Sequence, residues 1–174
     1  TATNLPASLG AMKRNVLVVE LDPQGNATMG SGISKNEIDL SVYDVITGKA
    51  GCAEAIVTTP EAGYDLLPAN GDLTAAEVEL MSVKMKEHRL QYALAEVKHH
   101  YDYIFIDCPP SLNMLTVNAL AAAEQVLIPM QCEYYALEGL AALMDTIHSI
   151  QKVVNPKLEI GGLLRTMYDP RNSL

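Results

Sequence analysis

The sequence has few cysteines, few positive charges and no long apolar run. Its three cysteines (Cys52, Cys108 and Cys132) are odd in number, widely spaced and without a CxxC pair. This excludes a disulfide scaffold and a zinc ribbon, and it suits a reducing cytoplasm. Twelve Lys and Arg against 21 Asp and Glu give a net charge of −9, which disfavours bulk attraction to nucleic acid or anionic membranes. We expect no membrane-spanning helix, which needs about 18 or more apolar residues, and no secretory signal.

Apolar residues are plentiful in comparison. Hydrophobic residues occupy 49% of the 174 positions and charged residues 19%, which is enough for a buried core. The length favours one domain, expected over residues 1–174. Because the chain starts at Thr1 rather than Met and stops within a polar segment, we expect this domain to be incomplete at its N- and C-termini.

Short apolar runs alternate with amphipathic stretches along the chain. The runs are typical of strands buried on both faces, and they lie at 16–19, 64–68, 103–106, 126–129 and 160–164. The stretches between them predict helices at 41–46, 72–97, 111–123 and 137–154, with Ser111 as the cap of the third, and a loop at 23–34. Such alternation predicts an α/β fold with a mostly parallel sheet and helices on both faces.

Carboxylates and amides follow three of these predicted strands, in the segments 20–26, 107–111 and 131–135. Ligands of open α/β sheets bind outside the carboxyl ends of the strands, so we expect these groups to meet there. Acids beside apolar strands indicate a cation. Hydrated Mg²⁺ on a nucleotide phosphate is a common case, because it needs only one or two carboxylates. The alternative is that each acid is simply a solvated loop residue.

Four ordered segments resemble motifs of the ParA/Soj partition ATPases. Residues 18–28 (VVELDPQGNAT) resemble the family's DxDPQGNAT segment, and residues 104–111 (IFIDCPPS) resemble its Walker B segment, hhhDxPPS. Residues 133–139 (EYYALEG) and 166–171 (TMYDPR) resemble the stretches E-Y-x-A-L-E-G and T-M-Y-D-x-R. The motifs span nearly the whole chain. The resemblance implies an α/β fold of the P-loop NTPase type, with a mostly parallel sheet and helices on both faces.

The resemblance also implies a role for each matching position. Asp107 would hold Mg²⁺ through water, and Asp22 would orient or activate the water that attacks the γ-phosphate. Pro109 and Pro110 would form a switch that responds to the γ-phosphate. Thr166 and Met167 would lie near the base of the nucleotide. The expected nucleotide-binding positions are Glu20, Gln24, Pro109, Pro110, Thr166 and Met167, and those near a dimer face are Gln131, Glu133 and Tyr134. Glu20 stands where the family most often has Asp.

The implied function is ATP hydrolysis in chromosome or plasmid partition, with ATP and Mg²⁺ as cofactors. The protein would switch between an ADP monomer and an ATP-bound sandwich homodimer, and a DNA-bound ParB-type protein would stimulate it. It would bind DNA non-specifically through a C-terminal part beyond this chain, and it would be cytoplasmic and nucleoid-associated, without stable membrane insertion. The family's phosphate-binding loop, KGGVGKT, does not occur in the sequence. We therefore expect this chain alone to bind ATP poorly and to hydrolyse it negligibly.

Two other functions stay open. One is a MinD-like, membrane-associated ATPase that positions division proteins, which a C-terminal amphipathic helix would mark. The DPQGN stretch at 22–26 favours the partition branch instead. The other is a non-catalytic remnant that acts only as an interaction domain.

Overall fold

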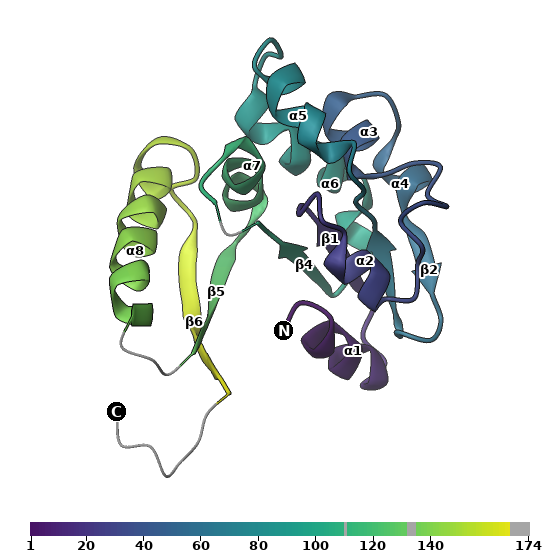
Figure 1. Cartoon of the computed structure of the whole chain (residues 1–174), viewed down its shortest axis with the longest axis horizontal. Coiled ribbons are helices and arrows are strands. Elements are labelled where there is room, and N and C mark those ends of the chain that lie inside the picture. The colour runs from purple at the N-terminus through teal and green to yellow at the C-terminus, as the bar shows by residue number, and fades with distance from the viewer. Residues whose placement is uncertain (110, 132–134, 168–174) are drawn as a thin grey trace. The chain divides into compact units, whose positions relative to one another are not determined.

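The computed structural model describes residues 1–109, 111–131 and 135–167. The chain divides into two compact units, Thr1–Ala122 and Ala123–Leu174 (Figure 1). The first unit contains, in chain order, α1 (Asn4–Ala11), β1 (Val16–Glu20), α2 (Asn26–Gly30), α3 (Val42–Thr47), α4 (Cys52–Ala55), β2 (Val57–Thr59), β3 (Tyr64–Leu67), α5 (Leu73–Leu80), α6 (Arg89–Val97), β4 (Tyr103–Asp107) and α7 (Met114–Ala122). The second contains β5 (Gln125–Gln131), α8 (Tyr135–Val153) and β6 (Glu159–Thr166). The single domain expected over 1–174 stays a prediction.

The sheet of the first unit has the order β2-β3-β1-β4. The strand β1 pairs in parallel with β3 and with β4, and β2 pairs antiparallel with β3. Every residue of β1 is buried because helices cover both faces of the sheet. Leu17 and Val19 pack with α3 to α7, whereas Val16 and Val18 pack with side chains that include two from α1. The predicted α/β fold, with a mostly parallel sheet and helices on both faces, is confirmed.

The second unit has its own parallel strand pair. β5 and β6 run in register from Gln125 opposite Glu159 to Gln131 opposite Thr166, with one irregularity near Val126. Past the end of α8, the Asn155 amide donates a hydrogen bond to the carbonyl of Ala123 at 2.8 Å. In the described parts of the chain, no helix combines the length and the apolar character needed to cross a membrane.

The expected helix over 72–97 is wrong. The chain forms α5 and α6 instead, with a break between them at which Met85 has a positive φ of 54°. Asn118 of α7 stabilises the break: it is fully buried, accepts the N–H of Leu90 at 3.1 Å and donates to the carbonyl of Lys86 at 2.7 Å. Helical periodicity could not reveal this break, because its hydrogen-bond partner lies in a later helix.

Shorter elements were also missed or misplaced. The predicted loop at 23–34 contains α2, and the sequence pattern did not predict α4 or β2. Ser111 does not cap α7, which begins at Met114; the side chain of Asn113 accepts the N–H of Thr116 at 3.0 Å instead. The elements α2, α4 and β2 are so short that their apolar periodicity carries little signal.

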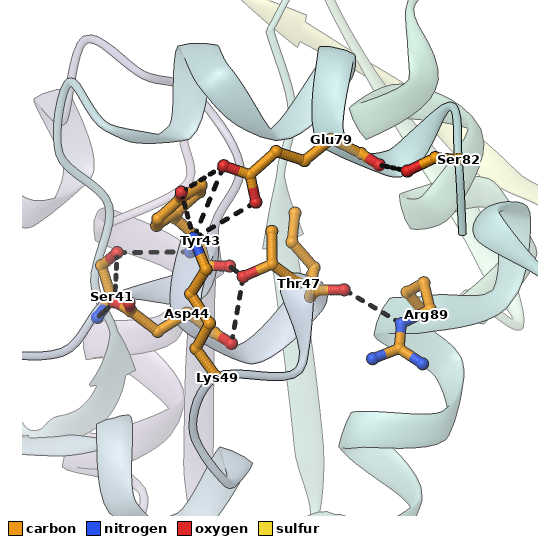
Figure 2. Close-up of polar contacts among 9 residues, drawn as sticks. Ser41, Tyr43, Asp44, Thr47, Lys49, Glu79, Ser82 and Arg89 are labelled. Atoms are coloured by element: carbon orange, nitrogen blue, oxygen red, sulfur yellow. Dashed lines mark hydrogen bonds and ion pairs between the residues drawn. The ribbon is translucent and has the colours of Figure 1, made fainter. Parts of the chain in front are cut away.

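Polar contacts hold α3 against α5 and α6 (Figure 2). The Tyr43 hydroxyl donates to Glu79 at 2.6 Å, and the Lys49 ammonium lies 3.2 Å from the same carboxylate. From α6, Arg89 donates through Nε to the carbonyl of Ile46 at 3.0 Å (Figure 2). These contacts fix part of the helical layer that covers one face of β1.

Candidate functional site

Two acidic strand ends lie side by side in the first unit. Glu20 is the register partner of Asp107, and the N–H of Leu21 donates to the carbonyl of Asp107 at 2.8 Å. Because β1 and β4 are parallel, their carboxyl ends share one edge of the sheet, and Asp22 follows directly beyond it. The structure therefore brings Glu20, Asp22 and Asp107 together.

The Asp107 carboxylate is half-buried, and among the described residues it accepts no hydrogen bond. Burial raises its pKa and the nearby charge of Asp22 raises it further, while the α-amino group of Thr1 opposes the rise. A cation at this edge would relieve the repulsion between the two aspartates.

Asp22 sits in a tight turn. One of its carboxylate oxygens, Oδ1, accepts the N–H of Gln24 at 2.9 Å, and its carbonyl accepts the N–H of Gly25 at 3.0 Å. Gly25 has a φ of 67°, a conformation that glycine adopts without steric cost. No donor in the described parts of the chain reaches the other carboxylate oxygen, so Asp22 keeps one acceptor for a ligand or a water.

Glu20 is placed differently. Its side chain is fully buried, and its two carboxylate oxygens accept the N–H groups of Ala27 and Thr28, each at 2.7 Å. The Thr28 hydroxyl donates a further hydrogen bond to it. Burial raises the pKa of Glu20, and these three hydrogen bonds oppose the rise. The carboxylate is thus engaged by the start of α2, and its expected contact with a nucleotide stays a prediction.

The donor groups at this edge determine which kind of metal site it could form. Within residues 1–109, 111–131 and 135–167, no group of three or more His, Cys, Asp or Glu side chains could hold a metal ion by itself. Mg²⁺ that keeps its waters and binds phosphate oxygens needs only one or two carboxylates. Asp107 with Asp22 beside it therefore fits a hydrated, phosphate-bound Mg²⁺ and not a metal held by protein ligands alone.

The other predicted residues lie at varied places. Pro109 is partly buried just after Asp107, and the side chain of Gln24 is exposed. In the second unit, the Thr166 hydroxyl donates to the carbonyl of Met130 at 3.3 Å, and Met167 is 84% exposed. The roles of these residues near a nucleotide stay predictions. Gln131 pairs with Thr166 at the end of β5, and the roles predicted for Pro110, Glu133 and Tyr134 fall on residues outside the described part of the chain.

Two residues at this edge were missed by sequence reasoning. Lys35 donates through Nζ to the carbonyl of Gln24 at 3.3 Å, which places a positive charge beside the Asp22 turn. Thr28 accepts the N–H of Ala69 on its hydroxyl at 3.1 Å. The motif at 18–28 contains Thr28, but no sequence signal indicated its partner after β3.

A hollow of about 500 Å³ lies at the other end of the strands. Its lining includes Arg14 and Asn15 before β1, Asp65 in β3 and Tyr101 before β4. The Tyr101 hydroxyl donates to Asp65 at 2.9 Å, so part of its polar lining is already paired. The hollow shares no residue with the acidic edge.

The chain matches, over residues 1–160, a protein family described as an AAA domain. It is 48% identical over 174 residues to the sporulation initiation inhibitor protein Soj of Bacillus subtilis, covering all of this chain and 69% of that protein. It is 47% identical over 176 residues to the chromosome partitioning protein ParA of Caulobacter vibrioides, covering all of this chain and 66% of that protein. The chain belongs to the ParA/Soj family.

This result confirms the family that the four sequence motifs predicted. An uncharacterized protein of Pseudomonas putida is 60% identical over 174 residues, and the chain spans 66% of its length. A solved structure named cobyrinic acid a,c-diamide synthase, from Mycobacterium smegmatis, has a TM-score of 0.94 and 40% identity, covering 98% of this chain and 68% of that one. That crystal structure contains an ATP analogue and magnesium.

Proposed function

We propose that the protein is an ATPase that partitions chromosomes or plasmids. The observation that carries this proposal is the meeting of Asp22 and Asp107 at the carboxyl ends of neighbouring parallel strands, in a chain that is 47% identical to a chromosome partitioning protein ParA. Partition is preferred over the activity named for the cobyrinic acid a,c-diamide synthase structure, because the ParA protein of Caulobacter vibrioides, which has a partition name, is more similar to this chain, at 47% identity against 40%.

In the proposed mechanism, the substrate is ATP and the resident cation is Mg²⁺, which would neutralise the charge of the phosphates. Asp107 would hold the hydrated ion through water, since its carboxylate has no competing hydrogen-bond donor among the described residues. Asp22 would accept a hydrogen bond from the attacking water on its second carboxylate oxygen and so hold that water in line. Pro109 and Pro110 would link the occupancy of the γ-phosphate site to the segment that follows β4.

The remaining parts of the proposal concern assembly. The protein would form a sandwich dimer with ATP and return to a monomer with ADP, because loops ordered by the γ-phosphate relax once it leaves. A ParB-type protein bound to DNA would be its partner, and it would bind DNA non-specifically through a C-terminal part. It would act in the cytoplasm on the nucleoid.

The test is the substitution Asp22→Ala in the whole protein. A group that positions the attacking water acts mainly in the transition state, so we expect kcat to fall by about 10²- to 10⁴-fold. ATP binding and ATP-dependent dimerisation, measured by light scattering with and without Mg²⁺, should persist. Turnover at the normal rate by the variant would refute the role of Asp22. Equal ATP affinity of the wild type with and without Mg²⁺ would refute the metal role of Asp107.

The 174-residue chain by itself should bind ATP weakly and hydrolyse it negligibly. Most of the phosphate-binding energy in this family is expected from the KGGVGKT loop, whose backbone N–H groups and lysine surround the phosphates, and this motif is not in the sequence. Isothermal titration of the chain with Mg²⁺ and ATP measures this directly. Micromolar affinity would contradict the expectation.

A further inference from the structure

Thr28 is not among the predicted site residues, yet its side chain is fully buried and makes two hydrogen bonds. Its hydroxyl donates to the carboxylate of Glu20 and accepts the backbone N–H of Ala69 at 3.1 Å. The N–H of Ala69 can only donate, so the Thr28 hydroxyl accepts that hydrogen bond. The hydroxyl has one proton of its own, which it donates to Glu20 when that carboxylate is ionised. Thr28 therefore connects the end of β1 to the segment that follows β3.

The turn between Asp22 and Thr28 meets the same segment a second time. At Gly25 a Cβ atom would lie 3.1 Å from the carbonyl oxygen of Ala69, so the turn and this segment are in close contact. The N–H of Ala69 thus faces Thr28, and its carbonyl faces Gly25. These two residues bound the second half of the turn, residues 25–28. Asp22 closes the first half through the N–H of Gln24.

We propose that Thr28 is a positioning residue for Asp22. It acts through the backbone. The two hydrogen bonds of its hydroxyl hold the start of α2 between Glu20 and Ala69. The position of α2 then fixes the conformation of the preceding turn, which presents the free carboxylate oxygen of Asp22. The proposal rests on the proposed function, because it assumes that Asp22 orients the attacking water. Thr28 touches neither nucleotide nor water in this account. A displacement of about 1 Å at a catalytic group can lower a rate about 100-fold, so a small shift of the turn should be measurable.

The test compares Thr28→Val and Thr28→Ser in the whole protein. Valine keeps the volume and removes the hydroxyl, whereas serine keeps the hydroxyl. We expect Thr28→Val to lower kcat about 10- to 100-fold and to leave KM for ATP within about twofold of the wild type. Here kcat is calculated from the concentration of protein that binds nucleotide, so that unfolded molecules do not count. Thr28→Ser should restore kcat to near the wild-type value.

The matched control is Thr59→Val. Thr59 is also buried and donates its hydroxyl to a backbone carbonyl, that of Tyr64, but it lies at the end of β2. This variant loses a buried hydrogen bond of similar type and should keep the wild-type kcat. If Thr28→Val does not fold, Gly25→Ala decides the matter, because its Cβ would push the turn away from Ala69 and should also lower kcat at constant KM.

The outcomes separate the two proposals. Wild-type kcat in Thr28→Val, or in Gly25→Ala where that variant decides, would overturn the positioning role and leave the ATPase proposal standing. An equal loss in Thr59→Val, or a Thr28→Ser variant as slow as Thr28→Val, would also overturn it. A whole protein without Mg²⁺-dependent ATP hydrolysis would overturn the proposed function, and the positioning role with it.

Discussion

Glu20 and Asp107 occupy equivalent positions at one edge of the sheet, but their surroundings differ. They are register partners on parallel strands, and burial raises the pKa of both. The carboxylate of Glu20 accepts hydrogen bonds from two backbone N–H groups and a hydroxyl of α2, whereas that of Asp107 accepts none from the described residues. An acid at a strand end can therefore serve the fold or remain open to a ligand. The number of hydrogen-bond donors around the carboxylate decides between these two roles.

The largest effect on stability should come from Glu20→Ala. The substitution leaves three buried donors of Ala27 and Thr28 without their acceptor. The free energy of unfolding should fall by about 2–4 kcal/mol, at about 1 kcal/mol or more for each donor. Urea unfolding at neutral pH measures the loss. The control is Glu37→Ala at an exposed glutamate, which should stay within about 0.5 kcal/mol of the wild type. Similar losses in both variants would contradict the distinction between Glu20 and an ordinary surface acid.

Asp107→Asn should act in the opposite direction when no ligand is present. Burial and Asp22 raise the pKa of Asp107, so the folded state favours the protonated form. Below the unfolded pKa the acid is protonated in both states and costs nothing. Between the unfolded and the folded pKa only the unfolded state ionises, so the wild type loses stability relative to the variant as the pH rises, and the loss is complete above the folded pKa.

The measurement is Tm against pH without Mg²⁺ or nucleotide. At pH 7, Asp107→Asn should melt higher than the wild type, by about 2–4 °C if the relief is about 1 kcal/mol. The difference should vanish on acidification to about pH 3, below the ordinary aspartate pKa. A variant that melts lower than the wild type at pH 7 would show that Asp107 is stabilised by its surroundings, as Glu20 is.

The smallest effect concerns the thiol next to Asp107. Burial raises the pKa of Cys108 to about 12, and the charge of Asp107 contributes to the rise. Burial likewise raises the pKa of Cys52 to about 11, with a contribution from Glu96. In Asp107→Asn, alkylation of Cys108 at pH 9 should accelerate by less than about tenfold, and Cys52 should be unchanged. Peptide mass spectrometry resolves the two sites. An equal acceleration at both cysteines would indicate general loosening of the fold.

Much of the fold was predictable because strand and helix periodicity are local properties. The apolar runs at 16–19 and 103–106 became β1 and β4, which place Asp22 and Asp107 at one edge. The break between α5 and α6 was not predictable, since it depends on a buried amide from Asn118. The antiparallel strand β2 was missed because it is short and one of its residues is exposed.

The sequence alone determined which chemical groups follow the strands and which family motifs contain them, because residue types and spacing are written along the chain. Only the tertiary structure decided how each group is used. The turn after β1 folds back onto Glu20 and brings Thr28 to the N–H of Ala69, a partner 41 positions later in the chain. Hydrogen bonds between distant segments depend on packing in three dimensions, and no local pattern encodes them.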